Sequence, residues 1–134
     1  MKPGITFFHE QLPNTFFDRL TDQDQNLVDL VVVIGTSMKV SPVNQIPNFL
    51  PAKVPIIYIS RDPAPHINFD ISLIGYCDDI VAELARRAGW SINHELFNSK
   101  ARARVIAFDD SGAHWEVTMP GSSHTAEEAA NPGE

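Results

Sequence analysis

Two runs of apolar residues dominate the middle of the chain, and each has the length and composition of a β-strand. The run "LVDLVVVIG" at 27–35 is interrupted by one polar residue, Asp29, and "VPIIYIS" at 54–60 is apolar up to its last residue. Continuous apolar strands are typical of a parallel sheet that is covered on both faces. "FDISLIG" at 69–75 alternates more, which predicts a strand nearer the sheet edge, and "GITFF" at 4–8 predicts a further short strand.

Helical patterns separate these runs. Asn14 is the expected N-cap of a first helix, whose Phe16 and Phe17 are expected in the core, and Pro47 predicts a short or kinked helix after Pro42. The clearest helix begins near Asp78 and ends at a glycine. Its expected apolar stripe, over which Trp90 is expected to fold back, consists of Ile80, Val81, Leu84 and Ala88.

The alternation of strands and helices predicts an α/β fold with a parallel sheet, and "RARVIAFDDSGAHWEVTMP" predicts a hairpin at its end. Parallel sheets bind ligands at the carboxyl ends of their strands. Three polar loops, "GTS", "SRDP" and "GYCDD", follow predicted strands, so their convergence predicts a binding site. Taken singly, each loop is better explained by ordinary loop chemistry.

Composition excludes several functions. The 134 residues carry a net charge of -7 without a basic cluster, which argues against direct nucleic-acid binding. The longest apolar stretch is far too short to cross a membrane, and no secretory leader opens the chain. Cys77 is the single cysteine, so an internal disulfide and a multi-cysteine zinc site are both excluded.

Four motifs resemble the carboxyl-terminal half of the sirtuins, the NAD-dependent protein-lysine deacylases. "KPGITFFHEQLP" is similar to the family's "KPxIVFFGExLP", and "GTSMKVSPV" to "GTSLKVxPV". "IYISRDP" is similar to "ILINREP", and "FDISLIGYCDDIVAELARRAGW" to "FDxxLLGDCDxxxxELxxxxGW". The match covers about residues 2–92 in the family's order and looks most like the nuclear class I sirtuins of fungi.

This resemblance implies domains and a cofactor. Residues 1–97 would be the second half of a Rossmann-like, doubly wound domain, 98–119 a hairpin extension and 120–134 a disordered tail. NAD would be the cofactor. The implied NAD-binding residues, on its adenosine side, are Gly35, Thr36, Ser37, Ser60, Arg61, Asp62 and Cys77. Serine replaces the family's asparagine at position 60, and the backbone amide of Cys77 is expected to contact adenine.

Peptide binding carries over to two segments that would hold the substrate backbone as an added strand. They consist of Thr6, Phe7, Phe8, His9 and Glu10 on one side and Val40 on the other. Phe8 would line the acyl-lysine tunnel. His9 departs from the family's glycine, and a histidine is strained there if the loop needs a positive φ, so the peptide side matches the family less well than the NAD side.

Other residues receive simpler interpretations. "HEQLP" lacks the second histidine of a zinc-protease motif. His66, His94, His114, His124 and Lys39 are interpreted as solvated, and the acidic pair at 78–79 as favouring a helix N-terminus. No metal ligand and no catalytic residue is therefore assigned.

The resemblance implies part of a nuclear NAD-dependent protein deacetylase, a transferase of chromatin silencing that acts on acetylated proteins such as histone tails. The cytoplasm is the alternative location. The family's glycine-rich loop, histidine base and four zinc-binding cysteines do not occur in this sequence. We therefore expect a fragment or truncated gene product that is inactive and marginally folded alone. The alternatives are a catalytically dead module that binds NAD or peptide, and a non-functional remnant.

Overall fold

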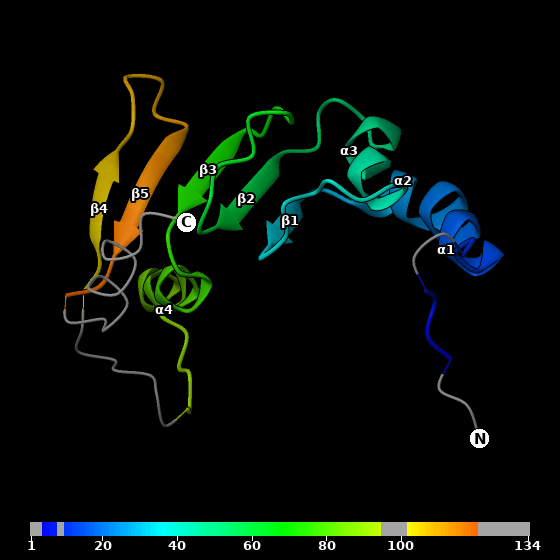
Figure 1. Ribbon diagram of the computed structural model, residues 1–134. Coiled ribbons are helices and arrows are strands. Elements are labelled where there is room, and N and C mark those ends of the chain that lie inside the picture. The colour runs from blue at the N-terminus through cyan, green and yellow to red at the C-terminus, as the bar shows by residue number, and fades with distance from the viewer. Residues whose placement is uncertain (1–3, 8–9, 95–101, 121–134) are drawn as a thin grey trace, which may run out of the picture.

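The computed structural model describes residues 4–7, 10–94 and 102–120, which build one sheet of five strands in the order β1-β2-β3-β5-β4 (Figure 1). The strands are β1 (Val31–Ile34), β2 (Ile56–Ser60), β3 (Ile71–Ile74), β4 (Arg104–Ala107) and β5 (His114–Thr118). β1, β2, β3 and β5 pair in parallel, and β4 pairs antiparallel with β5. The predicted α/β class with a terminal hairpin is confirmed.

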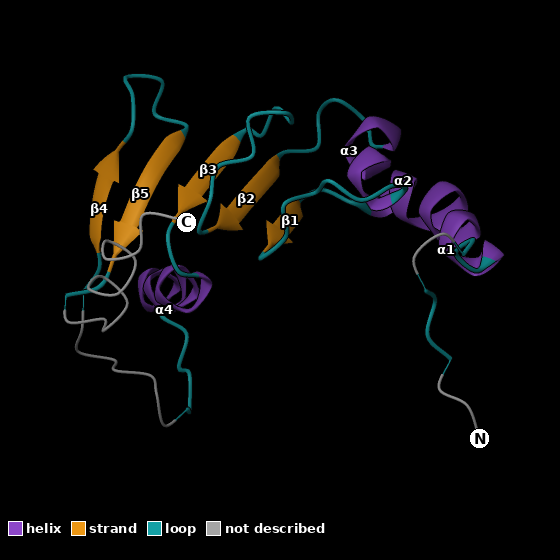
Figure 2. Cartoon of the chain, in the orientation of Figure 1, coloured by secondary structure: helices purple, strands orange, loops and turns teal. Residues whose placement is uncertain are grey.

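The helices divide into two groups (Figure 2). α1 (Asn14–Arg19), a π-helical turn (Leu20–Asp24), α2 (Gln25–Leu27), a 3-10 turn (Val43–Gln45) and α3 (Ile46–Phe49) lie beyond the β1 edge of the sheet. α4 (Cys77–Ala88) instead contacts β2 and β5. None of the described helices has the length and apolarity that a membrane span requires.

The sheet buries a different cluster on each face. Because strand side chains alternate, Tyr58 belongs to one cluster and its neighbour Ile59 to the other. The first cluster is closed by loops and consists of Val33, Met38, Ile56, Tyr58, Ala64, Phe69 and Ile74. The second contains Ile59 from β2, Ile80 from α4 and Val117 from β5, so α4 packs against side chains of β2 and β5 on this face of the sheet.

β3 lies inside the sheet, which corrects the prediction of a strand nearer the edge. β5 pairs with β3 from Ser72 to Ile74 and so covers the side of β3 that faces away from β2. The hairpin thus extends the sheet, and its antiparallel strand β4 takes the outer position. The alternating pattern of β3 did not indicate this neighbour, because strands pair through backbone hydrogen bonds, which do not depend on the polarity of the side chains.

Three details near the N-terminus differ from the predictions. Residues 4–7 carry no strand, and position 8 of the expected "GITFF" strand lies outside the described residues. Pro13, not Asn14, occupies the N-cap of α1. Phe17 is 38% exposed rather than buried, while Leu20 is buried on the same helical segment. The short helix near Pro47 is confirmed as the four-residue α3.

α4 begins and ends where the sequence predicts, but it buries a different face. Gly89 ends the helix in the left-handed conformation, with φ of 71°. Ile80, Glu83 and Ala85 are buried, whereas Val81 and Leu84 of the expected stripe are 39% and 42% exposed. Trp90 does not fold back over the helix, since its side chain is 73% exposed.

Candidate functional site

The loop after β1 turns sharply at Gly35, whose φ of +65° favours glycine. Its amide donates to the carbonyl of Ile59 at 2.9 Å, so this donor is already used by the sheet. A Cβ at this position would lie 3.8 Å from Cys77 Sγ, which places the first loop beside α4. In the next residue, Thr36, Oγ1 accepts a hydrogen bond from the amide of Met38 at 3.2 Å.

The loop after β2 is attached to its surroundings by side chains. The hydroxyl of Tyr58 donates to the carbonyl of Asp62 at 2.9 Å. His66 Nε2 lies 3.4 Å from the carbonyl of Met38 and so connects this loop to the one after β1. Arg61 and Asp62 form an exposed ion pair at 3.7 Å, which contributes little to stability.

The N-terminus of α4 supplies the third wall. Gly75 donates from its amide to the carbonyl of Ser60 at 2.9 Å, which brings the start of the helix to the end of β2. The side chain of Tyr76, the N-cap residue, makes no capping hydrogen bond to the first amides of the helix. The Cys77 thiol lies 3.8 Å from the carbonyl of Ile59.

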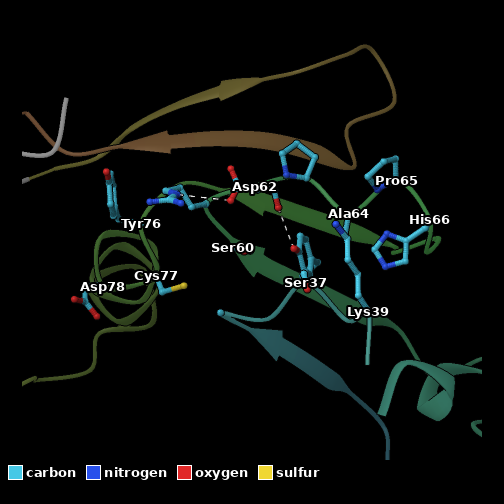
Figure 3. A pocket seen from close by; sticks show the side chains of 14 residues that line it. Ser37, Lys39, Ser60, Asp62, Ala64, Pro65, His66, Tyr76, Cys77 and Asp78 are labelled. Carbon is cyan, nitrogen blue, oxygen red and sulfur yellow. Dashed lines mark hydrogen bonds and ion pairs between the residues drawn. The ribbon is translucent and has the colours of Figure 1, made fainter. Parts of the chain in front are cut away.

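These three segments enclose a cavity of about 780 Å³ at the carboxyl end of the parallel strands (Figure 3). The structure therefore brings together most of the residues predicted for the NAD side, namely Gly35, Ser37, Ser60, Arg61, Asp62 and Cys77. Thr36 does not line the cavity, and its hydroxyl instead bonds within the loop. Figure 3 shows Cys77 and Asp78 on α4 at one side, with Ser37 and Lys39 across from them.

The cavity has further lining residues that the sequence patterns did not predict. Lys39 and His66, interpreted as solvated, lie together at the far end of the cavity from α4, and Tyr76 and Asp78 lie at the helix end (Figure 3). Pro63, Ala64 and Pro65 complete the loop wall, and Tyr58 lines the cavity from inside the sheet. Position alone could have indicated Tyr58, because it points to the same face as Ser60 two residues later on β2.

The predicted peptide-binding segments are only partly described. Phe8 and His9 lie outside the described residues. The amide of Phe7 donates to Glu10 Oε2 at 2.9 Å in an exposed local turn, and Thr6 is also exposed. Figure 1 shows this N-terminal segment beyond α1, away from the strands. Val40 is 54% exposed, and among the described residues no hydrogen bond joins it to the N-terminal segment. The peptide assignment stays a prediction.

Within the described part of the chain, no group of three or more His, Cys, Asp or Glu side chains is arranged to hold a metal ion. The polar side chains of the cavity are hydroxyls, the carboxylates of Asp62 and Asp78, the imidazole of His66, one ammonium group and one guanidinium group. Such a mixture of donors and acceptors suits an organic ligand with several oxygen and nitrogen atoms.

The parallel sheet and the cavity at its carboxyl edge define a protein of the Rossmann-like α/β class. The Sir2 family model matches residues 1–42. The chain is 50% identical to the NAD-dependent histone deacetylase SIR2 of Saccharomyces cerevisiae over 98 residues, which is 73% of this chain and 17% of that protein. It is 51% identical to the NAD-dependent protein deacetylase sirtuin-1 of Mus musculus over 89 residues, 66% of this chain and 12% of that protein. The chain belongs to the Sir2 family, as its motifs predicted, and spans less than a fifth of the length of these relatives.

Proposed function

We propose that this chain forms the adenosine side of the NAD site of a protein-lysine deacetylase. One observation carries the proposal. Three loops separated in sequence place Gly35, Ser37, Ser60, Arg61, Asp62 and Cys77 around one cavity, and those residues had been assigned to NAD from sequence alone. The names of the relatives, NAD-dependent histone and protein deacetylases, support the same assignment.

The cavity fits this part of the cofactor in chemistry and in size. A volume of about 780 Å³ lies within the range of small-molecule sites. Ser37 and Ser60 offer hydroxyls to ribose oxygens, and the amides at the start of α4 offer donors to adenine. Gly35 contributes no side chain, so its turn leaves the cavity open beside Cys77.

When bound, NAD supplies the nicotinamide ribose carbon that accepts the acyl oxygen. The role of this chain is to bind and orient the adenosine end, since none of the cavity residues is assigned as a general base. The acetylated protein would lie against residues 6–10 and Val40. We further propose that the substrates include histone tails and that the protein is nuclear, because the fungal relatives are named histone deacetylases.

Calorimetric titration of the chain with NAD tests the cofactor site. We expect saturable binding that Ser60→Ala weakens by about 3- to 10-fold, the usual effect of one lost hydrogen bond. The matched control is Ser91→Ala, because Ser91 is exposed and does not line the cavity. The proposal fails if the unsubstituted chain takes up no NAD, or if both alanine variants bind equally well.

A deacetylation assay tests the catalytic proposal separately. We expect the 134-residue chain to bind NAD and yet leave an acetylated peptide unchanged, because the family's motif with the histidine base does not occur in this sequence. Release of nicotinamide and loss of the acetyl group would show instead that the chain is a complete catalyst. NAD binding without turnover agrees with both the fragment and the catalytically dead module.

A further inference from the structure

Tyr58 lies at the centre of β2 and is almost completely buried, with 1% of its surface exposed. Its ring stacks on Phe69, with centroids 4.4 Å apart and planes 10° from parallel. A buried tyrosine hydroxyl needs a hydrogen-bond partner. Here the partner is the carbonyl of Asp62 at 2.9 Å, a bond that runs from the sheet core to the loop after β2.

This loop depends on side chains for its position. Residues 61–66 wall the cavity, and two of them, Pro63 and Pro65, have no amide hydrogen to donate. Contacts that hold the segment include the Tyr58 bond, a long contact from His66 to Met38 at 3.4 Å and one local turn from Ile67 to Ala64 at 3.2 Å. Of these, the Tyr58 bond is the shortest, and it acts beside Arg61 and Asp62.

The hydroxyl is a departure from the motif that the segment otherwise resembles. "IYISRDP" has tyrosine where "ILINREP" has leucine, and leucine cannot donate a hydrogen bond. The same short segment also has Ser60 in place of an asparagine. The bond from Tyr58 to Asp62 is therefore not specified by the motif.

We propose that Tyr58 is a positioning residue that holds the loop at 61–66 in the conformation that forms the cavity. The ring is fixed between the sheet and Phe69, so its hydroxyl is a rigid anchor for the Asp62 carbonyl. Its effect on NAD rests on the proposed function, since Arg61 and Asp62 would face the adenosine ribose. Tyr58 itself acts through the loop.

The variant Tyr58→Phe isolates the hydroxyl, because phenylalanine keeps the ring and its stacking on Phe69. We expect amide hydrogen exchange at Arg61, Asp62 and Ala64 to become about 10-fold faster, and NAD affinity to fall about 5- to 10-fold. The control is Asp70→Ala. Asp70 accepts from the Ile56 amide at 2.7 Å at the other end of β2, and it does not line the cavity. It should speed exchange at Ile56 and leave the loop and NAD affinity unchanged.

Exchange in β3 and β5 verifies that both variants remain folded. The proposal is overturned if loop exchange in Tyr58→Phe equals that of the unsubstituted chain. It is overturned as well if the loop loosens while NAD binds with undiminished affinity. A chain that binds no NAD before substitution contradicts the proposed function alone, and the exchange rates then still decide whether Tyr58 anchors the loop.

Discussion

Glu83 is a buried carboxylate that balances its charge with two neighbours on the same helix. Arg86 donates to it at 2.8 and 2.6 Å, and Arg87 donates at 2.7 Å. The hydrogen bond from Arg86 is the main reason why the pKa of Glu83 falls from 4.5 to about 2; burial opposes the shift, and Arg87 and the backbone of Ala103 add to it. Because Ala103 precedes β4, this carboxylate also connects α4 to the hairpin.

The lowered pKa predicts how stability depends on pH. The ionised form is favoured in the folded chain, so its contribution is fully present above pH 4.5 and is lost as pH falls from 4.5 towards 2. Urea unfolding at pH 7 and pH 3 should show this loss. Glu83→Gln should cost about 2 kcal/mol at pH 7, a value reduced for the solvent exposure of Arg87, and should flatten the pH dependence in this range. An equally steep acid loss in the variant would contradict the assignment.

Gly75 is required by a close approach of the hairpin. A Cβ at this position would lie 2.2 Å from the carbonyl oxygen of Val117, which is backbone on β5 and cannot rotate away. Gly75→Ala should therefore push β5 from β3 and lower the free energy of unfolding by about 2–4 kcal/mol. Thermal unfolding measures the loss. Gly4→Ala is the control, since no atom of the described residues lies within 4 Å of a Cβ at that position, and an equal effect of both would refute the clash.

At the scale of elements, periodicity predicted where α4 lies but not which side it buries. The pattern selected Val81 and Leu84 by their apolar side chains, yet these are partly exposed. Glu83 is buried because its arginine partners compensate its charge, and a hydrophobic pattern treats every carboxylate as surface. The ion pairs themselves have i,i+3 and i,i+4 spacing and can be read from the sequence, but the burial of Glu83 cannot.

The buried face of α4 can be verified by truncation. Ile80 is 1% exposed and packs with Ile59 and Val117, so Ile80→Ala should cost about 2–5 kcal/mol. Leu84→Ala, at the 42% exposed position, should cost less than about 1 kcal/mol. Both values come from urea unfolding at pH 7. A larger cost at Leu84 than at Ile80 would restore the stripe that the sequence predicted.

For the whole molecule, the sequence predicted where the cavity lies but only some of the residues that line it. Strand-end loops could be predicted because parallel strands direct their carboxyl ends to one edge of a sheet. Lys39 and His66 could not, because their place in the cavity depends on how two loops meet through the carbonyl of Met38. The pairing of β5 with β3 was equally hidden, since a hairpin's own pattern does not specify its neighbour.

β1 is an edge strand of the described sheet, and apolar side chains are exposed on one of its faces. Val32 and Ile34 are 46% and 49% exposed, and a largely apolar cavity of about 500 Å³ lies nearby between β1, the α1–α2 segment and α3. Exposed apolar edge strands pair with other chains. We therefore expect the purified chain to self-associate as its concentration rises.

Sedimentation velocity over a series of concentrations measures this association. Val32→Lys should shift the equilibrium towards monomer, because a lysine on the edge strand keeps its charge in water and opposes pairing. Val81→Lys is the matched control, since Val81 has a similar exposure of 39% on α4 and lies away from the β1 edge. A monomer at every concentration would mean that β1 is protected in another way. Equal dissociation of both variants would mean that net charge, rather than the strand edge, controls association.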